Sequence, residues 1–208
     1  MDLLIKEACV ENLTEAKNAE RLGASQIELC GRLDLDGITP DLSLVEKVLK
    51  GLSIHVKVMV RPRAGNFVYT EKEINVMEVS IEFLKSMGVQ EIVLGLLTDK
   101  NEIDIPSTEK LVELAHPIKV TFHKAIDKLD DPVKGVRQLM EIPGITAILT
   151  SGGKPTAREG APVIRQMILA AEDKLNIIAA GKITNENLLE IDRLIDADAY
   201  HGKLVVGI

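Results

Sequence analysis

Two cysteines occur in the same short pattern near the start of the chain. The segments Glu7–Cys9 and Glu28–Cys30 both read Glu-x-Cys, and each ends an apolar, strand-like run. If the two runs form neighbouring parallel strands, about 4.8 Å apart, the thiols could approach closely enough to share a soft ion. Two thiolates suit Cu(I), whereas a four-ligand zinc site would also need a histidine or a carboxylate. The alternative is that Cys9 and Cys30 are buried small hydrophobic residues.

A histidine and an aspartate mark a second place where chemistry is possible. The segment Lys119–Asp127 begins with alternating apolar and polar residues, which predicts a strand with one polar face that ends in His123. A histidine there could transfer a proton, oriented by Asp127 or Glu28. The alternative is a structural histidine held by hydrogen bonds.

Apolar strand-like segments alternate with amphipathic helix-like segments along the whole chain. The predicted strands are Leu3–Cys9, Gln26–Cys30, His55–Arg61, Glu91–Leu96, Lys119–His123, Ala147–Ser151, Asn176–Ala180 and Ala197–His201. This alternation predicts an α/β fold, a single-domain closed (β/α)8 barrel over residues 1–208. A doubly wound open sheet is the alternative, but no Gly-x-Gly-x-x-Gly follows the first strand.

The end of the chain is too short for a full eighth helix. Only residues 204–208 follow the turn after the last predicted strand, and they are mostly apolar. An uncovered strand and an apolar tail would leave an exposed hydrophobic patch. This edge is therefore expected to be covered by the tail itself or by a second subunit, in a homodimer or higher homo-oligomer.

The alternation within the first three strands places ionisable residues on the face that lines the barrel. The predicted inward residues are Glu7, Cys9, Gln26, Glu28, Cys30, His55, Lys57, Met59 and Arg61. Because unpaired buried charge is costly, Glu7 and Glu28 are expected to be paired. Their predicted partners in a single network are Lys57 and Arg61. The alternative to a functional network is a structural salt-bridge layer.

Basic residues follow several strands at the carboxyl end of the predicted barrel, although the chain has a formal net charge of −7. They are Arg61, Arg63, Lys124, Lys154, Lys182 and Lys203. Gathered around one mouth, they would favour a small anion. The late loops contain small residues that would let backbone N–H groups approach a phosphate or carboxylate: Ser151, Gly152, Gly153, Gly181 and Gly202.

The composition argues against several classes of protein. The negative charge disfavours a nucleic-acid or anionic-membrane surface, and with 2% aromatic residues and no Trp a base-stacking surface is not expected. No apolar run is long enough to cross a bilayer, and the first residues lack the pattern of a signal peptide. We therefore expect a cytoplasmic protein, in which two cysteines do not make a disulfide framework.

Ordered motifs from about residue 4 to residue 202 resemble the CutC family, which is named for copper homeostasis. The motifs are Glu7-Ala8-Cys9-Val10, Gly23-Ala24, Ile27-Glu28-Leu29-Cys30, Gly37-Ile38-Thr39-Pro40, Arg61-Pro62-Arg63 through Phe67 and Tyr69, Val120-Thr121-Phe122-His123 to Asp127, and Leu149-Thr150-Ser151-Gly152. The resemblance implies a TIM-barrel fold, a cytoplasmic location and Cu(I) ligation by Cys9 and Cys30. The chain departs from the family at 122–127, where Phe-His-Lys-Ala-Ile-Asp stands for Phe-His-Arg-Ala-Phe-Asp and exchanges a planar guanidinium for an ammonium group.

Two functional hypotheses follow. The first is a protein of copper homeostasis that binds Cu(I) through Cys9 and Cys30 at the barrel mouth. The second is an enzyme that acts on a small anionic or phosphorylated metabolite by acid/base chemistry. Its candidate catalytic residues are Glu28, Arg61, His123 and Asp127. Its candidate ligand-binding residues are Glu7, Arg63, Lys124, Ser151, Gly152, Gly153, Gly181 and Gly202.

Overall fold

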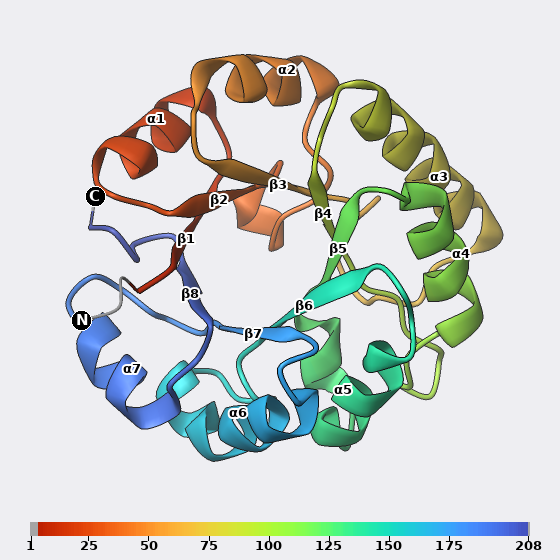
Figure 1. The fold of residues 1–208 in the computed structure, drawn as a ribbon. Coiled ribbons are helices and arrows are strands. Elements are labelled where there is room, and N and C mark those ends of the chain that lie inside the picture. The colour runs from red at the N-terminus through yellow and green to blue at the C-terminus, as the bar shows by residue number, and fades with distance from the viewer. Residues whose placement is uncertain (1–3, 208) are drawn as a thin grey trace.

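Eight short parallel strands close into a barrel in the order in which they occur in the chain, and helices surround them (Figure 1). The computed structural model describes residues 4–207. Its strands are β1 (Lys6–Val10), β2 (Gln26–Leu29), β3 (His55–Met59), β4 (Glu91–Leu94), β5 (Lys119–Phe122), β6 (Ile145–Thr150), β7 (Asn176–Ala179) and β8 (Ala199–Gly202). The (β/α)8 prediction is confirmed and the open sheet is wrong, because β8 pairs with β1. The predicted first strand begins at Leu3, which lies outside the described residues.

The helices follow the strands in regular order. They are α1 (Leu13–Arg21), α2 (Leu42–Gly51), α3 (Glu71–Ser86), α4 (Ile105–Ala115), α5 (Pro132–Met140), α6 (Ala157–Ala171) and α7 (Leu188–Ile195), with 3-10 turns η1 (Leu33–Leu35) and η2 (Lys124–Lys128). Helix α3 shows how sequence fixes a boundary. The Thr70 side chain accepts from the Glu73 backbone N–H, and the Glu73 carboxylate accepts from the Thr70 N–H. None of the helices in the described part of the chain is long and apolar enough to cross a membrane.

The residues after β8 pack on the barrel without forming an α-helix, as predicted, within the described range. Thr184 and Leu204 form a parallel bridge, and the side chains of Val205 and Val206 are buried in the main core. The tail therefore covers this edge itself. The expected homo-oligomer stays a prediction.

The interior of the barrel has an apolar side and a polar side. Strands β6, β7 and β8 contribute a small apolar cluster, which consists of Ala147, Leu149, Ile178, Ala180 and Ala199. Strands β1 to β5 instead carry buried ionisable and polar side chains, among them Glu7, Glu28, Lys57, Glu91 and Thr121. A barrel lumen usually packs branched apolar side chains. In this barrel the side of the lumen formed by β1 to β5 is polar, so a functional site is expected on that side.

Candidate functional site

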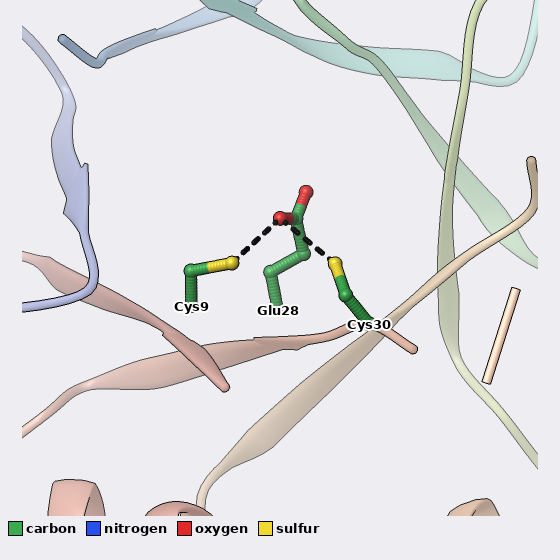
Figure 2. A group of neighbouring side chains, drawn as sticks. All are labelled: Cys9, Glu28 and Cys30. Carbon is green, nitrogen blue, oxygen red and sulfur yellow. Dashed lines mark hydrogen bonds between the residues drawn. The ribbon is translucent and has the colours of Figure 1, made fainter. Parts of the chain in front are cut away.

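The two cysteines meet at one carboxylate, at the carboxyl ends of β1 and β2. Cys9 lies opposite Glu28 in the strand register, and Cys30 directly follows β2. Both Sγ atoms lie 3.4 Å from the same oxygen, Glu28 Oε2, and each thiol donates to it (Figure 2). All three side chains are buried, and their ligand atoms lie within 4.8 Å of one another. The predicted approach of the two thiols is therefore seen.

The three acidic groups differ in how readily they ionise. The hydrogen bond with Cys30 lowers the pKa of Cys9 to about 5 in spite of its burial. The same hydrogen bond, together with burial, raises the pKa of Cys30. Burial is the main cause that raises the pKa of Glu28 to about 8. Cys9 is therefore the thiol that most readily supplies a thiolate, which is the form that binds metals and attacks electrophiles.

His201, on β8, adds an imidazole beside this group. Barrel closure pairs Glu7 with His201 in the strand register, and His201 Nδ1 lies 2.8 Å from Glu7 Oε1. The other ring nitrogen, Nε2, lies 3.8 Å from Glu28 Oε2. Sequence analysis singled out the neighbouring Gly202 and missed His201. The sequence did contain a signal for His201, because the alternation of β8 points this side chain into the barrel. That orientation becomes informative only when β8 is known to pair with β1.

Lys57 joins the lumen carboxylates into one network. Its Nζ lies 3.0 Å from Glu7 Oε2 and 3.1 Å from Glu91 Oε1, and Glu91 Oε2 lies 2.8 Å from His55 Nε2. Burial alone would raise the pKa of Glu7, but the charge of Lys57 and the contacts of His201 lower it to about 2. Burial alone would lower the pKa of Lys57, and the two glutamates raise it instead. The predicted Glu7–Lys57 pairing is thus observed, and Glu91 is a partner that sequence analysis did not name.

Arg61 does not belong to this network, so that part of the prediction is wrong. Its guanidinium donates to backbone carbonyls, through Nη1 to Leu35, Asp36 and Gly37 and through Nη2 to Gly65. The same group lies over the Phe67 ring, 5.1 Å from its centroid. Loop carbonyls compete successfully for the guanidinium because its donors form a rigid planar fork that matches several acceptors at once. Arg61 therefore holds the loops after β2 and β3 together.

His123 is buried under Phe67 and is not oriented by Asp127 or Glu28, contrary to expectation. Its Nδ1 accepts a hydrogen bond of 3.2 Å from the Ala125 backbone N–H, and its ring centroid lies 4.8 Å from that of Phe67. Burial, followed by the charge of Arg61, lowers the pKa of His123 to about 3. The ring is neutral at physiological pH, with its proton on Nε2, which has no partner among the described residues.

Replacing Gly95 with alanine is expected to lower the free energy of unfolding by about 1–3 kcal/mol, because a Cβ there would lie 2.3 Å from His123 Nδ1. Urea unfolding of the two proteins measures the difference. Gly51→Ala is a matched control, since its new Cβ meets only the flexible ends of Leu13 and Lys17. Equal stability of the two variants would contradict the proposed close packing of Gly95 on His123.

Asp127 occupies the loop that was predicted to bind an anion. Its carboxylate accepts hydrogen bonds from the Thr150 and Ser151 hydroxyls and from the backbone N–H groups of Ser151 and Gly153. Lys124 Nζ lies 3.8 Å from the same carboxylate. An external anion would have to displace Asp127 to reach these donors.

The remaining predicted ligand-binding residues lie around the mouth in separate contacts. Arg63 pairs with Glu73 and donates to the Val68 carbonyl. Gly181 and Gly202 allow close backbone approach, because an added Cβ would lie 2.7 Å from Ala157 N and 2.3 Å from Ile183 O, respectively. The structure does not bring Arg63, Asp127 and the thiols into contact with one another.

A cavity of about 350 Å³ opens at the opposite, N-terminal end of the strands. His55, Lys57, Glu91, Lys119 and Asp198 are among its lining residues. The lumen network therefore runs from this cavity, through Lys57 and Glu7, to His201 beside the thiols. This cavity is distinct from the thiol group at the carboxyl end.

The fold and the site define a TIM-barrel protein whose lumen carries one carboxylate with two thiols and an imidazole beside it. The chain belongs to the CutC family, whose profile matches residues 4–205. It is 38% identical over 195 residues to a protein of Histophilus somni described as a family protein CutC, covering 94% of this chain and 80% of that protein. It is also 38% identical over 197 residues to the mouse copper homeostasis protein cutC homolog, covering 95% of this chain and 72% of that protein.

A solved structure confirms the likeness in three dimensions. The CutC crystal structure from Streptococcus agalactiae superimposes with a TM-score of 0.93 at 31% identity, covering 98% of this chain and 100% of that one. Family and fold, which the motifs and the strand pattern predicted, are therefore confirmed.

Proposed function

We propose that the protein participates in copper homeostasis in the cytoplasm by binding Cu(I) through Cys9 and Cys30. The observation that carries the proposal is the contact of both thiols with the single oxygen Glu28 Oε2. Mouse and human relatives bear the name copper homeostasis protein, which agrees with a role in handling this ion. The ion is the cargo of the site in this proposal.

The chemistry of the thiol group suits a soft monovalent ion. Cu(I) prefers thiolate ligands, and sulfur donors disfavour the hard ions Mg²⁺ and Ca²⁺. Cys9 supplies a thiolate readily because of its low pKa, and the Cys30 thiol donates to the same Glu28 oxygen as the Cys9 thiol. Burial of the group limits access of water and of competing thiols. Met59 packs in the same cluster and places a thioether near the two cysteines.

Anaerobic titration with Cu(I) against a chromogenic chelator tests the proposal. The double variant Cys9→Ser/Cys30→Ser is expected to lose affinity by at least about 100-fold, since it removes both soft donors. Met77→Leu is the matched control, because it removes a buried thioether from the main core, outside the cluster that holds Cys9 and Cys30, and should leave the Cu(I) affinity unchanged. Equal Cu(I) affinity of the wild-type protein and the double cysteine variant would eliminate the proposal.

A second candidate function is an enzyme acting on a small anionic or phosphorylated metabolite. Buried polar atoms that lack a partner in the described part of the chain favour it, namely Glu28 Oε1, Arg61 Nε and His123 Nε2. Such atoms are costly unless a ligand or water satisfies them. In this reading His123 acts as a neutral donor to the substrate, and Arg61 and Arg63 attract its charge.

Thermal unfolding in the presence of sugar phosphates and small carboxylates tests the enzyme hypothesis. A ligand at about 100 times its Kd should add about 2.7 kcal/mol to the free energy of unfolding. His123→Asn should abolish the shift produced by any ligand found. A broad set without a stabilising compound would count against this function and leave the copper proposal untouched.

A further inference from the structure

The imidazole of His201 is held in the orientation that a metal ligand requires. Histidines that bind metals through one ring nitrogen usually donate the other ring N–H to a carboxylate, which fixes the tautomer. His201 Nδ1 lies 2.8 Å from Glu7 Oε1. The other oxygen of Glu7 is held by Lys57 Nζ at 3.0 Å and by Gln26 Nε2 at 2.6 Å. Glu7 is thus a fixed acceptor for the Nδ1 proton, and Nε2 is left to face the Glu28 carboxylate.

The position of Nε2 agrees with this role. It lies 3.8 Å from Glu28 Oε2, the oxygen that both thiols contact at 3.4 Å. Glu28 therefore joins the two thiols to the imidazole, because it belongs to both groups of neighbouring ligand atoms, Cys9–Glu28–Cys30 and Glu7–Glu28–His201.

Glu28 has an oxygen that the protein leaves without a partner. Its Oε1 is buried and makes no hydrogen bond to any described residue, although the side chain is only 3% exposed. A buried carboxylate oxygen without a partner is costly, and coordination of a cation would remove that cost. Glu7 is different, because Lys57, Gln26 and His201 already engage both of its oxygens.

We propose that His201 and Glu28 are the third and fourth protein ligands of the Cys9–Cys30 site, which makes it a tetrahedral site for a divalent ion of the zinc class. The inference rests on the proposed function in one respect, namely that the two cysteines bind metal. Zn²⁺ favours four-coordinate sites built from thiolate, imidazole and carboxylate donors. Two thiolates alone would satisfy Cu(I), so the additional imidazole and carboxylate are what a divalent ion needs.

The charge of the donor set also favours a divalent ion. Cys9, Cys30 and Glu28 are anionic as ligands, and His201 is neutral. With these four ligands, a divalent ion leaves one negative charge uncompensated, and a monovalent ion leaves two. Buried charge without compensation is unfavourable, so the same ligands hold a divalent ion at lower cost. The sulfur donors at the same time exclude the hard divalent ions, which require oxygen.

Titration of metal-free, reduced protein with Co²⁺ reports on the ligands directly, and competition with Zn²⁺ gives the affinity. We expect one equivalent of Co²⁺ to produce thiolate-to-cobalt charge-transfer bands and the intense visible bands of tetrahedral cobalt, which Zn²⁺ then removes. His201→Asn keeps a donor toward Glu7 but loses the ligand nitrogen. Its Zn²⁺ affinity should fall by at least about 100-fold, and Glu7→Gln, which loses the carboxylate that orients His201 together with the Lys57 ion pair, should cost about 10- to 100-fold.

His55→Asn is the matched control, because His55 also pairs with a buried glutamate but lies at the other end of the lumen. It should leave the cobalt spectrum and the Zn²⁺ affinity unchanged. Far-UV circular dichroism before each titration confirms that a variant is folded. Wild-type protein without thiolate-to-cobalt bands, or folded His201→Asn with the wild-type spectrum and affinity, would overturn the inference.

Parallel Cu(I) titrations separate this inference from the copper proposal. If cysteine replacement abolishes Cu(I) binding but the wild-type protein does not bind Co²⁺ or Zn²⁺, only the divalent site is refuted. If His201→Asn and Cys9→Ser both weaken Zn²⁺ binding while Cu(I) affinity does not depend on the cysteines, the divalent site stands and the copper proposal falls.

Discussion

Lys57→Met is expected to lower the free energy of unfolding by about 3–5 kcal/mol, because it leaves buried carboxylates without their cation. The Lys57 side chain is 4% exposed and contacts Glu7 and Glu91 at 3.0 and 3.1 Å. Methionine keeps much of the volume of lysine, so the loss reports mainly on charge. Urea unfolding at neutral pH measures it, and a reduced midpoint with an unchanged m-value is expected.

Two control variants separate pairing from packing. Lys50→Met breaks an ion pair with Glu46 in which both side chains are largely exposed, and it should cost less than about 1 kcal/mol. The triple variant Lys57→Met/Glu7→Gln/Glu91→Gln removes the unpaired charges and should recover much of the stability lost in Lys57→Met. If Lys57→Met were as mild as Lys50→Met, the lumen network would not be the tightly paired layer that the distances indicate.

The sequence predicted the barrel and the thiol pair because both depend on local patterns. Alternation within β2 and β3 placed Glu28 and Lys57 inward, and adjacency of β1 and β2 brought Cys9 toward Cys30. Strand phase and strand order, which a single sequence reveals well, were sufficient for these features. The family motifs pointed in the same direction.

Other parts of the site depend on closure and on loop conformation, which strand patterns do not specify. His201 meets Glu7 only because β8 closes on β1 across almost the whole length of the chain. Arg61 has the inward phase of β3, yet loop carbonyls bind its guanidinium. Asp127 turns back into the loop after β6 and satisfies its N–H groups, where an external anion was expected. The Arg61 guanidinium and the N–H groups of the loop after β6 were both expected to bind a ligand, and in both cases another part of the chain binds them instead.

Two glutamates in the lumen are expected to give the stability of the metal-free protein opposite dependences on pH. The pKa of Glu7 in the folded protein is about 2, below the usual value of 4.5, so its contribution to stability is present above pH 4.5 and is lost as the pH falls toward 2. The pKa of Glu28 is about 8, above the usual value, so the protein is stabilised below pH 4.5 and loses that stability as the pH rises through 8. From the size of these pKa shifts, the pH-dependent contribution to the free energy of unfolding is about 3 kcal/mol for Glu7 and about 5 kcal/mol for Glu28.

Glutamine variants test each half of this profile, because glutamine does not ionise. Relative to the wild-type protein, Glu28→Gln should gain stability from pH 5 to about pH 8 and then level off, because over this range the Glu28 carboxyl is ionised in the unfolded protein but protonated in the folded one. Glu7→Gln should be destabilised at pH 7, and the deficit should shrink as the pH falls from 5 toward 2. Urea unfolding across this range, with a reductant and a chelator present, gives both differences. A Glu28→Gln difference that is flat with pH would show that Glu28 ionises as an ordinary carboxylate.

Because a metal bound by Cys9 and Cys30 would hold Glu28 ionised, adding Zn²⁺ to the wild-type protein should remove most of the loss of stability at high pH.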